Sequence, residues 1–511
     1  MLHRSIALRL RHAIATILPE ADLGSVDVRP CPDPRHGDYQ SSALIGLAKA
    51  RRLNPRQLAT DLLASLDVSE WCDPVEIAGP GFLNFRVRPA ALAATLQRAV
   101  QGEHLFFERA SQPRTIVVDF SSPNVAKPMH VGHIRSTILG DCLVRTLRLL
   151  GHRVIADNHI GDWGTQFGKL LLGWKRGLDR DALERDAVGE MERLYRVTNA
   201  ECDSNPDTLA QAREELVRLQ NGDPDNLALW QDMNARSQHQ FDSIYARLGI
   251  RFDTTLGESF YNPRLKAVVA ELERSGVARE SEGAQVVFFE DDPALQKHPA
   301  IVQKSDGAAN YATTDLATLA YRLETWHPDE IVYVTDGRQQ LHFRQIFAVF
   351  RRWRPEANVK LAHVWFGSIL GPDGKPFKTR SGDTVKLADL LDEAEERALR
   401  LVTSKNPALP EAERREIARV VGLGALKYAD LLPNRQSDYV FDWDKMLALT
   451  GHTAPYLQYA YTRIRSIFRK QAEAVSGQAD WSHEASERFV VGQEEEIRLA
   501  KHLLTFGIVV E

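Results

Sequence analysis

Apolar and polar positions along residues 115–168 predict a strand, a helix and a second strand. Residues 116–118 form a β-branched run, as expected for a strand buried on both faces. A polar break at 121–124 follows, and a helix can begin just after Pro128, where a missing N–H costs nothing. Apolar residues then recur at three- and four-residue steps: Ile134, Ile138, Leu139, Leu143, Leu147 and Leu150. With a second strand at 153–156, the stretch is typical of a βαβ unit, whose ligands bind at the carboxyl end of the first strand.

The pattern changes along the rest of the chain, which predicts several domains. Residues 1–110 mix helix and strand patterns around a Gly-Pro-Gly turn. Mixed-charge helical patterns fill about 170–298, strand and helix patterns then return up to 388, and the pattern is helical at 389–511. We therefore predict a multidomain α/β protein, with a doubly wound parallel-sheet catalytic domain at 111–388 that carries a helical insertion, an N-terminal α+β domain and a C-terminal all-α helical bundle.

Composition narrows the classes of protein without choosing one. The 511 residues carry a formal net charge of −5, so a polyanionic partner must be met by local basic patches. The sequence has no run of about 18 apolar residues that would span a membrane, so we expect no membrane association. Its 4 cysteines are far apart, which argues against disulfides and a zinc ribbon and fits a reducing compartment.

Two histidines and a glycine open the predicted helix. His130 and His133 lie three residues apart and share a face of its first turn. The free N–H groups and positive dipole end of a helix start favour anions, and two imidazoles there can donate hydrogen bonds to a phosphate that gains charge. Gly132 between them would let a base or a ribose approach the backbone closely. An isolated HxxH pair is more often two surface histidines or half of a metal site, and the surrounding strand, loop and helix favour the phosphate interpretation.

The sequence SSPNVAKPMHVGH at 121–133, with GDWGTQFG at 161–168, resembles the arginine-specific class I aminoacyl-tRNA synthetases. His-Val-Gly-His matches the His-Ile-Gly-His signature of that class, and the flanking residues point to arginine. The resemblance implies a Rossmann-like enzyme that converts L-arginine and ATP to arginyl-adenylate and pyrophosphate. Arginine would then pass to the 3′-terminal adenosine of its cognate tRNA, tRNA(Arg). We further expect Mg²⁺ carried with ATP, no metal held by the protein, and a monomeric cytoplasmic enzyme.

Two carboxylates are candidates for binding the arginine side chain. Asp119 ends the first strand, and Asp315 lies near the start of a helix predicted from about 313. Near one pocket, they would suit the planar fork of a guanidinium, although Asp315 by itself is equally well explained as a helix N-cap. Tyr311 would face the same way and could pack against the guanidinium. The resemblance implies an arginine site at these positions: Asp119, Ser122, Pro123, Asn124, His133, Tyr311, Asp315 and Gln339.

A basic, glycine-rich segment at 371–386 is the second chemical element. In isolation it is a solvated basic hairpin, but beside the histidines it could close on a pyrophosphate leaving group. Residues 377–381, FKTRS, resemble a degenerate Lys-Met-Ser-Lys-Ser loop in which Arg380 replaces the second Lys, and Arg and Lys are not equivalent phosphate ligands. We predict that Lys127 supplies the missing ammonium. The predicted catalytic residues are His130, His133, Lys127, Lys378 and Arg380, and the predicted ATP-binding residues are Lys127, His130, Gly132, His133 and Lys378.

Aromatic and basic residues alternate in the helical region at 389–511. This mixture suits RNA, because it offers stacking platforms and phosphate contacts, but it also describes a helix core with a basic outer face. The resemblance implies that this region binds the anticodon, that 1–110 contacts the tRNA elbow, and that helices present in family members are missing after Glu511. The predicted tRNA contacts are Lys427, Tyr428, Arg435, Tyr459 and Arg463.

Two other functions fit parts of the sequence. A small-molecule adenylyltransferase with an HxGH signature would not need the N-terminal domain or the aromatic and basic helices. A non-catalytic tRNA-binding protein derived from a synthetase would be marked by the loss of His130, His133 or the basic segment, and the sequence contains all of them.

Overall fold

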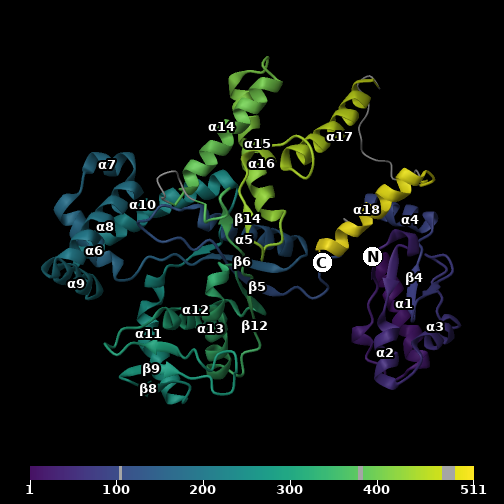
Figure 1. Ribbon diagram of the computed structural model, residues 1–511, viewed down its shortest axis with the longest axis horizontal. Helices are drawn as coiled ribbons and strands as arrows, with labels where there is room; N and C mark the ends of the chain where they lie inside the picture. The colour runs from purple at the N-terminus through teal and green to yellow at the C-terminus, as the bar shows by residue number, and fades with distance from the viewer. Residues whose placement is uncertain (103–105, 378–383, 475–489, 511) are drawn as a thin grey trace. The chain divides into compact units, whose positions relative to one another are not determined.

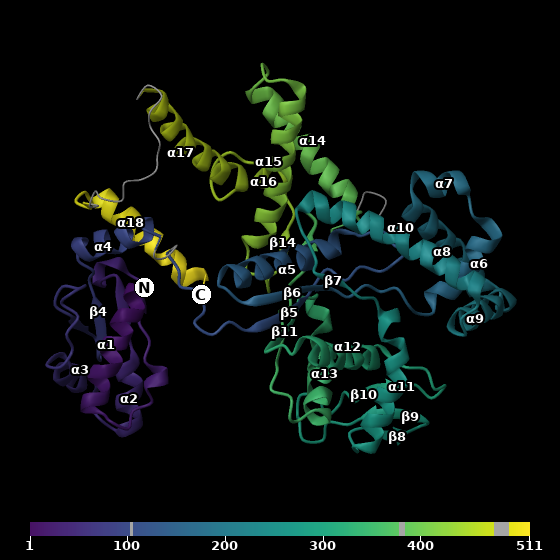
Figure 2. The same cartoon turned by 180° about the vertical axis from the view of Figure 1, so that it is seen from behind.

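The chain divides into two compact units (Figures 1 and 2). The N-terminal unit comprises 1–111 with 149–151 and 475–511, and the catalytic unit comprises 112–148 and 152–474. Among the described residues, none of the helices combines the length and apolarity that crossing a bilayer requires. The computed structural model describes residues 1–102, 106–377, 384–474 and 490–510.

The N-terminal unit is an antiparallel sheet with helices, which confirms the predicted α+β fold. Its strands are hydrogen-bonded in the order β1 (Arg29–Pro30), β2 (Tyr39–Ser41), β4 (Phe82–Phe85) and β3 (Glu76–Ala78). Its helical segments are α1 (Leu2–Ile17), η1 (Leu23–Ser25), η2 (Pro34–His36), α2 (Ala43–Arg51), α3 (Pro55–Leu63), α4 (Pro89–Val100) and α18 (Glu494–Val510). The amphipathic α1 buries Ile6, Leu10 and Ile14 at four-residue steps. α18 adds Leu504 to the same core, and its Lys501 forms a 2.6 Å ion pair with Asp38.

The catalytic unit is built on a parallel sheet, as predicted. Its strands run in the order β12 (Lys360–His363), β11 (Glu330–Tyr333), β5 (Thr115–Asp119), β6 (Arg153–Asn158) and β7 (Thr254–Thr255). The predicted βαβ unit is β5, α5 (Val131–Leu149) and β6, with β5 and β6 paired in parallel. Ile116 and Val118 of β5 enter one core while Val117 enters another, so this strand is buried on both faces.

Helices and small sheets surround the central sheet (Figures 1 and 2). The predicted insertion contains α6 (Gln166–Gly177), α7 (Arg180–Arg185), α8 (Ala187–Ser204), α9 (Pro206–Gln220), α10 (Pro224–Leu248) and α11 (Glu258–Arg274). An antiparallel sheet follows, in the order β10 (Ala300–Gln303), β9 (Ala284–Val287) and β8 (Arg279–Ser281). Next come α12 (Tyr311–Trp326), η3 (Gly337–Gln339) and α13 (Gln340–Trp353). The helical region contains α14 (Leu387–Lys405), α15 (Glu411–Leu431), α16 (Trp443–Met446) and α17 (Ala454–Ala474), with β13 (Ile369–Leu370) paired in parallel to β14 (Tyr439–Val440).

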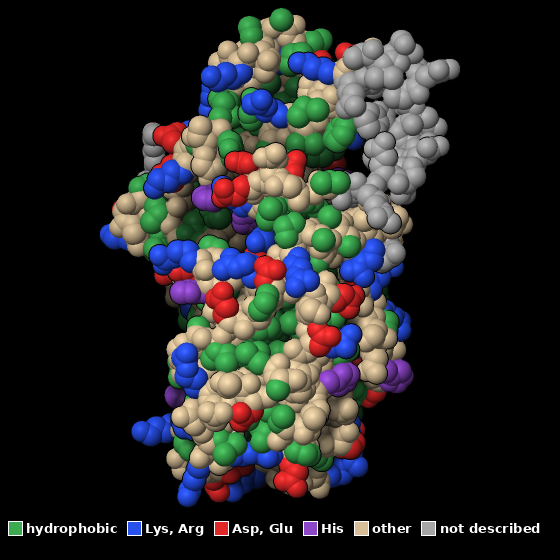
Figure 3. All heavy atoms as spheres, turned by 90° about the vertical axis from the view of Figure 1, so that its right-hand side faces the viewer, with side chains coloured by type: hydrophobic (Ala, Val, Ile, Leu, Met, Phe, Trp, Pro, Cys, Tyr) green, Lys and Arg blue, Asp and Glu red, His purple; other side chains and the backbone are tan. Residues whose placement is uncertain are grey.

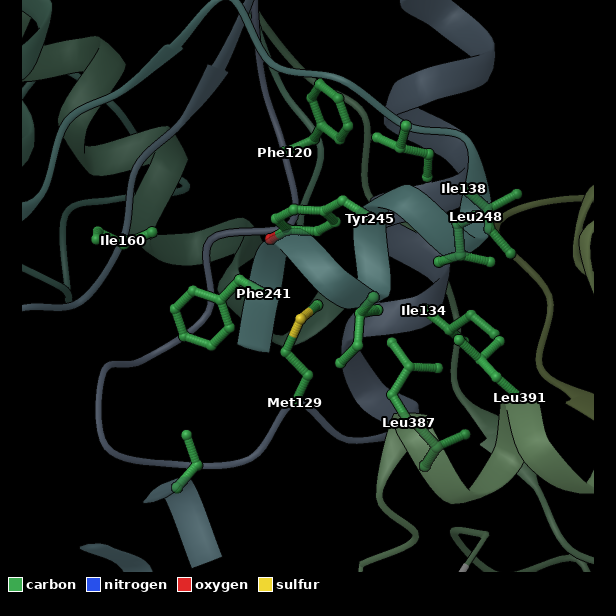
Figure 4. Close-up of a cluster of buried hydrophobic side chains, with 14 of the residues drawn as sticks. Phe120, Met129, Ile134, Ile138, Ile160, Phe241, Tyr245, Leu248, Leu387 and Leu391 are labelled. Atoms are coloured by element: carbon green, nitrogen blue, oxygen red, sulfur yellow. The ribbon is translucent and has the colours of Figure 1, made fainter. Parts of the chain in front are cut away.

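Apolar packing fixes the position of α5, the helix that carries the two signature histidines. Figure 4 shows Ile134 and Ile138 of α5 in a buried cluster with Tyr245 of α10 and Leu387 of α14. Gly140 lets α5 approach the chain directly after β5, because a Cβ there would lie only 2.2 Å from the Phe120 ring. The helix start is therefore held beside the carboxyl end of β5.

Candidate active site

A pocket of about 290 Å³ opens at the carboxyl ends of β5 and β11, beside the first turn of α5. This is the edge of the sheet at which the βαβ pattern predicted a ligand. Most of the sequence-predicted residues line it: Asp119, Ser122, Asn124, His130, Gly132, His133, Asp315 and Gln339. Pro123, Lys127 and Tyr311 do not line it. Two predicted catalytic residues, Lys378 and Arg380, lie outside the described residues.

Backbone hydrogen bonds fix the proton positions of the two signature histidines. The Gly132 N–H donates to His130 Nδ1 at 3.0 Å, and the His130 N–H donates to His133 Nδ1 at 3.1 Å. Because each Nδ1 accepts a hydrogen bond from a backbone N–H, each neutral ring carries its own proton on Nε2. Burial lowers the pKa of His133 to about 3, and burial, followed by Arg338 and Lys127, lowers the pKa of His130. Both imidazoles are therefore neutral N–H donors at neutral pH.

The structure gives a steric reason for glycine at position 132, in addition to the close approach of a ligand. A Cβ at this position would lie 2.7 Å from the His130 ring, so a side chain would disturb the ring that accepts the Gly132 N–H. The same turn is also held by hydrogen bonds at the carboxyl end of the basic segment. The Val131 N–H donates to the Val385 carbonyl at 2.9 Å, and the Leu387 N–H donates to the Met129 carbonyl at 2.8 Å. The end of the basic segment and the residue that follows it are thus tied to the start of α5.

Asp119 is held by a buried arginine that sequence reasoning missed. Arg322 of α12 is completely buried, and its Nη2 lies 2.6 Å from Asp119 Oδ2 and 2.7 Å from Asp157 Oδ2. The Ser122 hydroxyl donates to the other Asp119 oxygen at 3.1 Å. One signal was present in the sequence, because Asp157 lies near the end of the second strand of the βαβ unit. In the structure the two aspartates are register partners in the sheet. Arg322, in the middle of a helix, gave no such signal.

Asp315 also has an internal partner. His342 Nε2 of α13 lies 2.5 Å from Asp315 Oδ2, and both residues line the pocket. Asp315 is not the helix N-cap, because α12 begins at Tyr311 and the Asn310 side chain accepts the Tyr311 N–H. Burial, followed by the charges of Asp315 and Asp162, raises the pKa of nearby Glu258 to about 8. Glu258 therefore stays largely protonated at neutral pH.

Two other predicted side chains point elsewhere. Tyr311 at the start of α12 is 73% exposed, so the structure does not bring it into the lining of the pocket. Lys127 places its Nζ 5.3 Å from the centre of the Tyr195 ring on α8, which is a cation–π distance.

Four of the five predicted tRNA contacts form two pairs. The Lys427 ammonium donates to the Leu248 carbonyl, and Arg435 donates to the Trp365 carbonyl at 2.5 Å, so both bind the protein itself. Tyr459 and Arg463 of α17 are exposed, and the Arg463 guanidinium lies 5.7 Å from the Tyr459 ring centre.

The fifth predicted contact, Tyr428, lines a second pocket in the helical region.

On the face shown in Figure 3, basic side chains are interspersed with acidic ones. Within the described residues, no group of three or more His, Cys, Asp or Glu side chains could hold a metal ion.

Comparison with known families accounts for most of the chain. The family "tRNA synthetases class I (R), catalytic domain" matches residues 95–443. "Arginyl tRNA synthetase N terminal domain" matches residues 4–87, and "DALR anticodon binding domain" matches residues 457–511.

Comparison with individual proteins points to the same family. An arginine–tRNA ligase of Citrobacter koseri is 46% identical over 485 residues, which are 94% of this chain and 82% of the relative. One of Klebsiella pneumoniae subsp. pneumoniae is 47% identical over the same shares. Arginyl-tRNA synthetase structures from Plasmodium falciparum and Thermus thermophilus each superpose with a TM-score of 0.81, at 28% and 26% identity. They cover 99% and 100% of this chain, and 87% of each of those chains is matched.

Proposed function

The chain belongs to the arginyl-tRNA synthetase family, and from this premise we propose how its pocket carries out the reaction of an arginine–tRNA ligase. The enzyme activates L-arginine with ATP to arginyl-adenylate and pyrophosphate, and then transfers arginine to the 3′-terminal adenosine of tRNA(Arg). One observation carries the assignment of chemistry to this pocket. Two neutral imidazoles that donate through Nε2 and two carboxylates line the same cavity at the start of α5.

The carboxylates Asp119 and Asp315 bind the guanidinium of arginine. Each is oriented by an internal basic side chain, Arg322 or His342, so its remaining lone pairs have defined directions. A carboxylate that is already fixed loses little entropy when it accepts a planar guanidinium. Ser122, Asn124 and Gln339 supply further polar groups at the rim of the same pocket.

The imidazoles of His130 and His133 act on the α-phosphate of ATP. Their Nε2–H groups donate hydrogen bonds that strengthen as the carboxylate of arginine attacks phosphorus and charge builds on its oxygens. Because both rings are neutral, they supply directed donors without a fixed positive charge. The positive dipole end of α5 lies beside the same anion and favours it.

Three cations are proposed to hold the outgoing phosphates. We assign this role to Lys127, Lys378 and Arg380. We propose that Mg²⁺ enters with ATP, where it would neutralise part of the phosphate charge. Lys127 leaves the Tyr195 ring, which is a modest attraction, to reach the pyrophosphate.

None of the residues assigned to tRNA contact lines this pocket. The exposed pair Tyr459 and Arg463 on α17 offers an aromatic platform beside a guanidinium, as RNA binding requires. We assign anticodon binding to 389–511, with further contacts at Lys427, Tyr428 and Arg435, and contact with the tRNA elbow to 1–110. The enzyme acts as a cytoplasmic monomer.

The test is arginine-dependent exchange of pyrophosphate into ATP, with and without tRNA(Arg). We expect exchange that requires arginine, and its loss in an Asp119→Asn variant through a raised KM for arginine. A matched control is Asp253→Asn, which removes a carboxylate that pairs with Arg148 and does not line the pocket. Exchange that depends on a substrate other than an amino acid would overturn the assignment and identify a small-molecule adenylyltransferase.

A further inference from the structure

Three buried charged side chains meet beneath the floor of the pocket. Arg322 Nη2 bridges Asp119 Oδ2 at 2.6 Å and Asp157 Oδ2 at 2.7 Å, while its Nε donates to the same Asp157 oxygen at 3.0 Å. The Arg322 guanidinium also lies 5.3 Å from the centre of the Tyr333 ring. Asp119 and Tyr333 end β5 and β11, and Asp157 is the register partner of Asp119 in β6, so the arrangement is built into the register of the sheet.

The three side chains differ in their access to the ligand. Asp119 lines the pocket, whereas Asp157 and Arg322 do not, and the Asp157 and Arg322 side chains are fully buried. When both carboxylates are ionised, they and the guanidinium sum to one negative charge. Burial raises the pKa of Asp157, and the Arg322 guanidinium opposes that rise. If Asp157 were neutral, Arg322 would cancel the charge of Asp119 and its own positive charge would repel a cationic ligand. If Arg322 were neutral, two carboxylates at adjacent strand ends would repel each other and retain a proton.

Stability alone does not account for this arrangement. A buried ion triad gains little or nothing over apolar residues of similar volume, because desolvation offsets the attraction. Within the described residues, Arg322 Nη1 and Asp157 Oδ1 have no hydrogen-bond partner, which makes the triad still less favourable as a structural element. The charge that the triad presents to the pocket is a reason to hold it there.

We propose that Arg322 and Asp157 are positioning residues that determine specificity, because Arg322 orients Asp119 while Asp157 offsets the Arg322 charge, leaving one negative charge at Asp119 for a cationic side chain. The proposal rests on the arginine site described above and deepens it. It concerns the choice between arginine and citrulline, its neutral isostere, in which a urea replaces the guanidinium. Other titratable groups near the floor are Asp315 with His342, and Glu258, Asp162 and His159.

The experiment measures binding of arginine and of citrulline to the full chain by calorimetry or competition. In Asp157→Asn, which is isosteric, we expect arginine affinity to fall by about tenfold or more, while citrulline affinity changes by less than about threefold. The double variant Arg322→Gln with Asp157→Asn restores one net negative charge, so its ratio of arginine to citrulline affinity should recover to within about threefold of the original. Asp253→Asn, which removes a carboxylate beside the same sheet, should leave the ratio unchanged.

Other results overturn the proposal. Equal losses for arginine and citrulline in Asp157→Asn would mean that the triad only supports the shape of the pocket. Failure of the double variant to recover discrimination, with ATP affinity intact, would show that charge balance is not what the triad supplies. If Asp157→Asn does not fold, the double variant, which leaves no unpaired buried guanidinium, carries the test by itself: a ratio of arginine to citrulline affinity more than about threefold below the original contradicts the idea. An Asp119→Asn variant with unchanged arginine affinity would overturn the arginine site itself, whereas a failure confined to Asp157 and Arg322 would leave that site standing.

Discussion

The two nitrogens of His130 have different tasks, and two substitutions separate them. Nδ1 accepts the Gly132 N–H at 3.0 Å, which leaves Nε2–H as the donor available to a phosphate. The side-chain oxygen of asparagine reaches about as far as Nδ1, so His130→Asn keeps the inward acceptor and removes the outward donor. The amide nitrogen of glutamine reaches about as far as Nε2, so His130→Gln keeps the donor and removes the acceptor.

The magnitudes of the two losses differ. A donor aimed at charge that develops in the transition state contributes about 10²–10³ in kcat, or about 2.7–4 kcal/mol. The Gly132 N–H is solvent-exposed, so losing its acceptor costs only about 1 kcal/mol, because water replaces it. We therefore expect His130→Asn to lose about 100- to 1000-fold in kcat and His130→Gln about tenfold or less.

The assay is arginine-dependent pyrophosphate exchange with saturating tRNA(Arg), with thermal unfolding of each variant as the control for folding. The KM for arginine should remain near that of the parent, because His130 acts on phosphate. The reasoning is refuted if His130→Asn loses less than about tenfold, or if His130→Gln is the more damaged of the two.

Three further predictions concern the pH dependence of stability and the outgoing phosphates. The pKa of His133 is lowered to about 3, so its contribution to the free energy of unfolding is fully present above its unfolded pKa of about 6.5. The free energy of unfolding should fall by about 2 kcal/mol on acidification to about pH 5. Urea unfolding at several pH values should show this slope, and His133→Asn, which cannot titrate, should lack it. Arg135→Met leaves the buried Asp430 carboxylate without its 3.0 Å ion-pair partner, which should lower the free energy of unfolding by about 3–5 kcal/mol above pH 6. Because burial raises the pKa of Asp430 to about 6, this loss of stability should shrink in urea titrations at more acidic pH. A loss of stability that does not depend on pH would contradict this. Lys127→Ala should lower pyrophosphate exchange by more than about tenfold, or about 1.4 kcal/mol. The control Tyr195→Leu, which removes only the cation–π partner, should lower exchange less. A loss below about tenfold for Lys127→Ala excludes a role of this lysine at the phosphates.

The residues that line the pocket were largely accessible from sequence. Asp119, His130 and His133 follow a β-branched strand and open an amphipathic helix, and such signals are local along the chain. Their internal partners were not accessible. Arg322 is 203 residues from Asp119, and His342 comes to Asp315 from a different helix. No local pattern reports such pairings, because they arise where separate elements pack together.

Basic residues illustrate the same limit. Lys427 and Arg435 stay predicted tRNA contacts, and nothing in the sequence indicated that each also donates to a backbone carbonyl of a distant segment. Burial also lowers the pKa of Lys427. Composition counts charges but does not say which of them face solvent.

The sequence by itself determined the strand, helix and strand around 115–158, the edge of the sheet at which ligands bind, and the family to which the chain belongs. These follow from hydrophobic periodicity, turn residues and motif spacing, all of which act over a few residues. The tertiary structure decided the neutral state of the two histidines, the partners of both carboxylates and the charge beneath the pocket. Those properties depend on desolvation and on nearby charges, and both come from segments that only folding brings together.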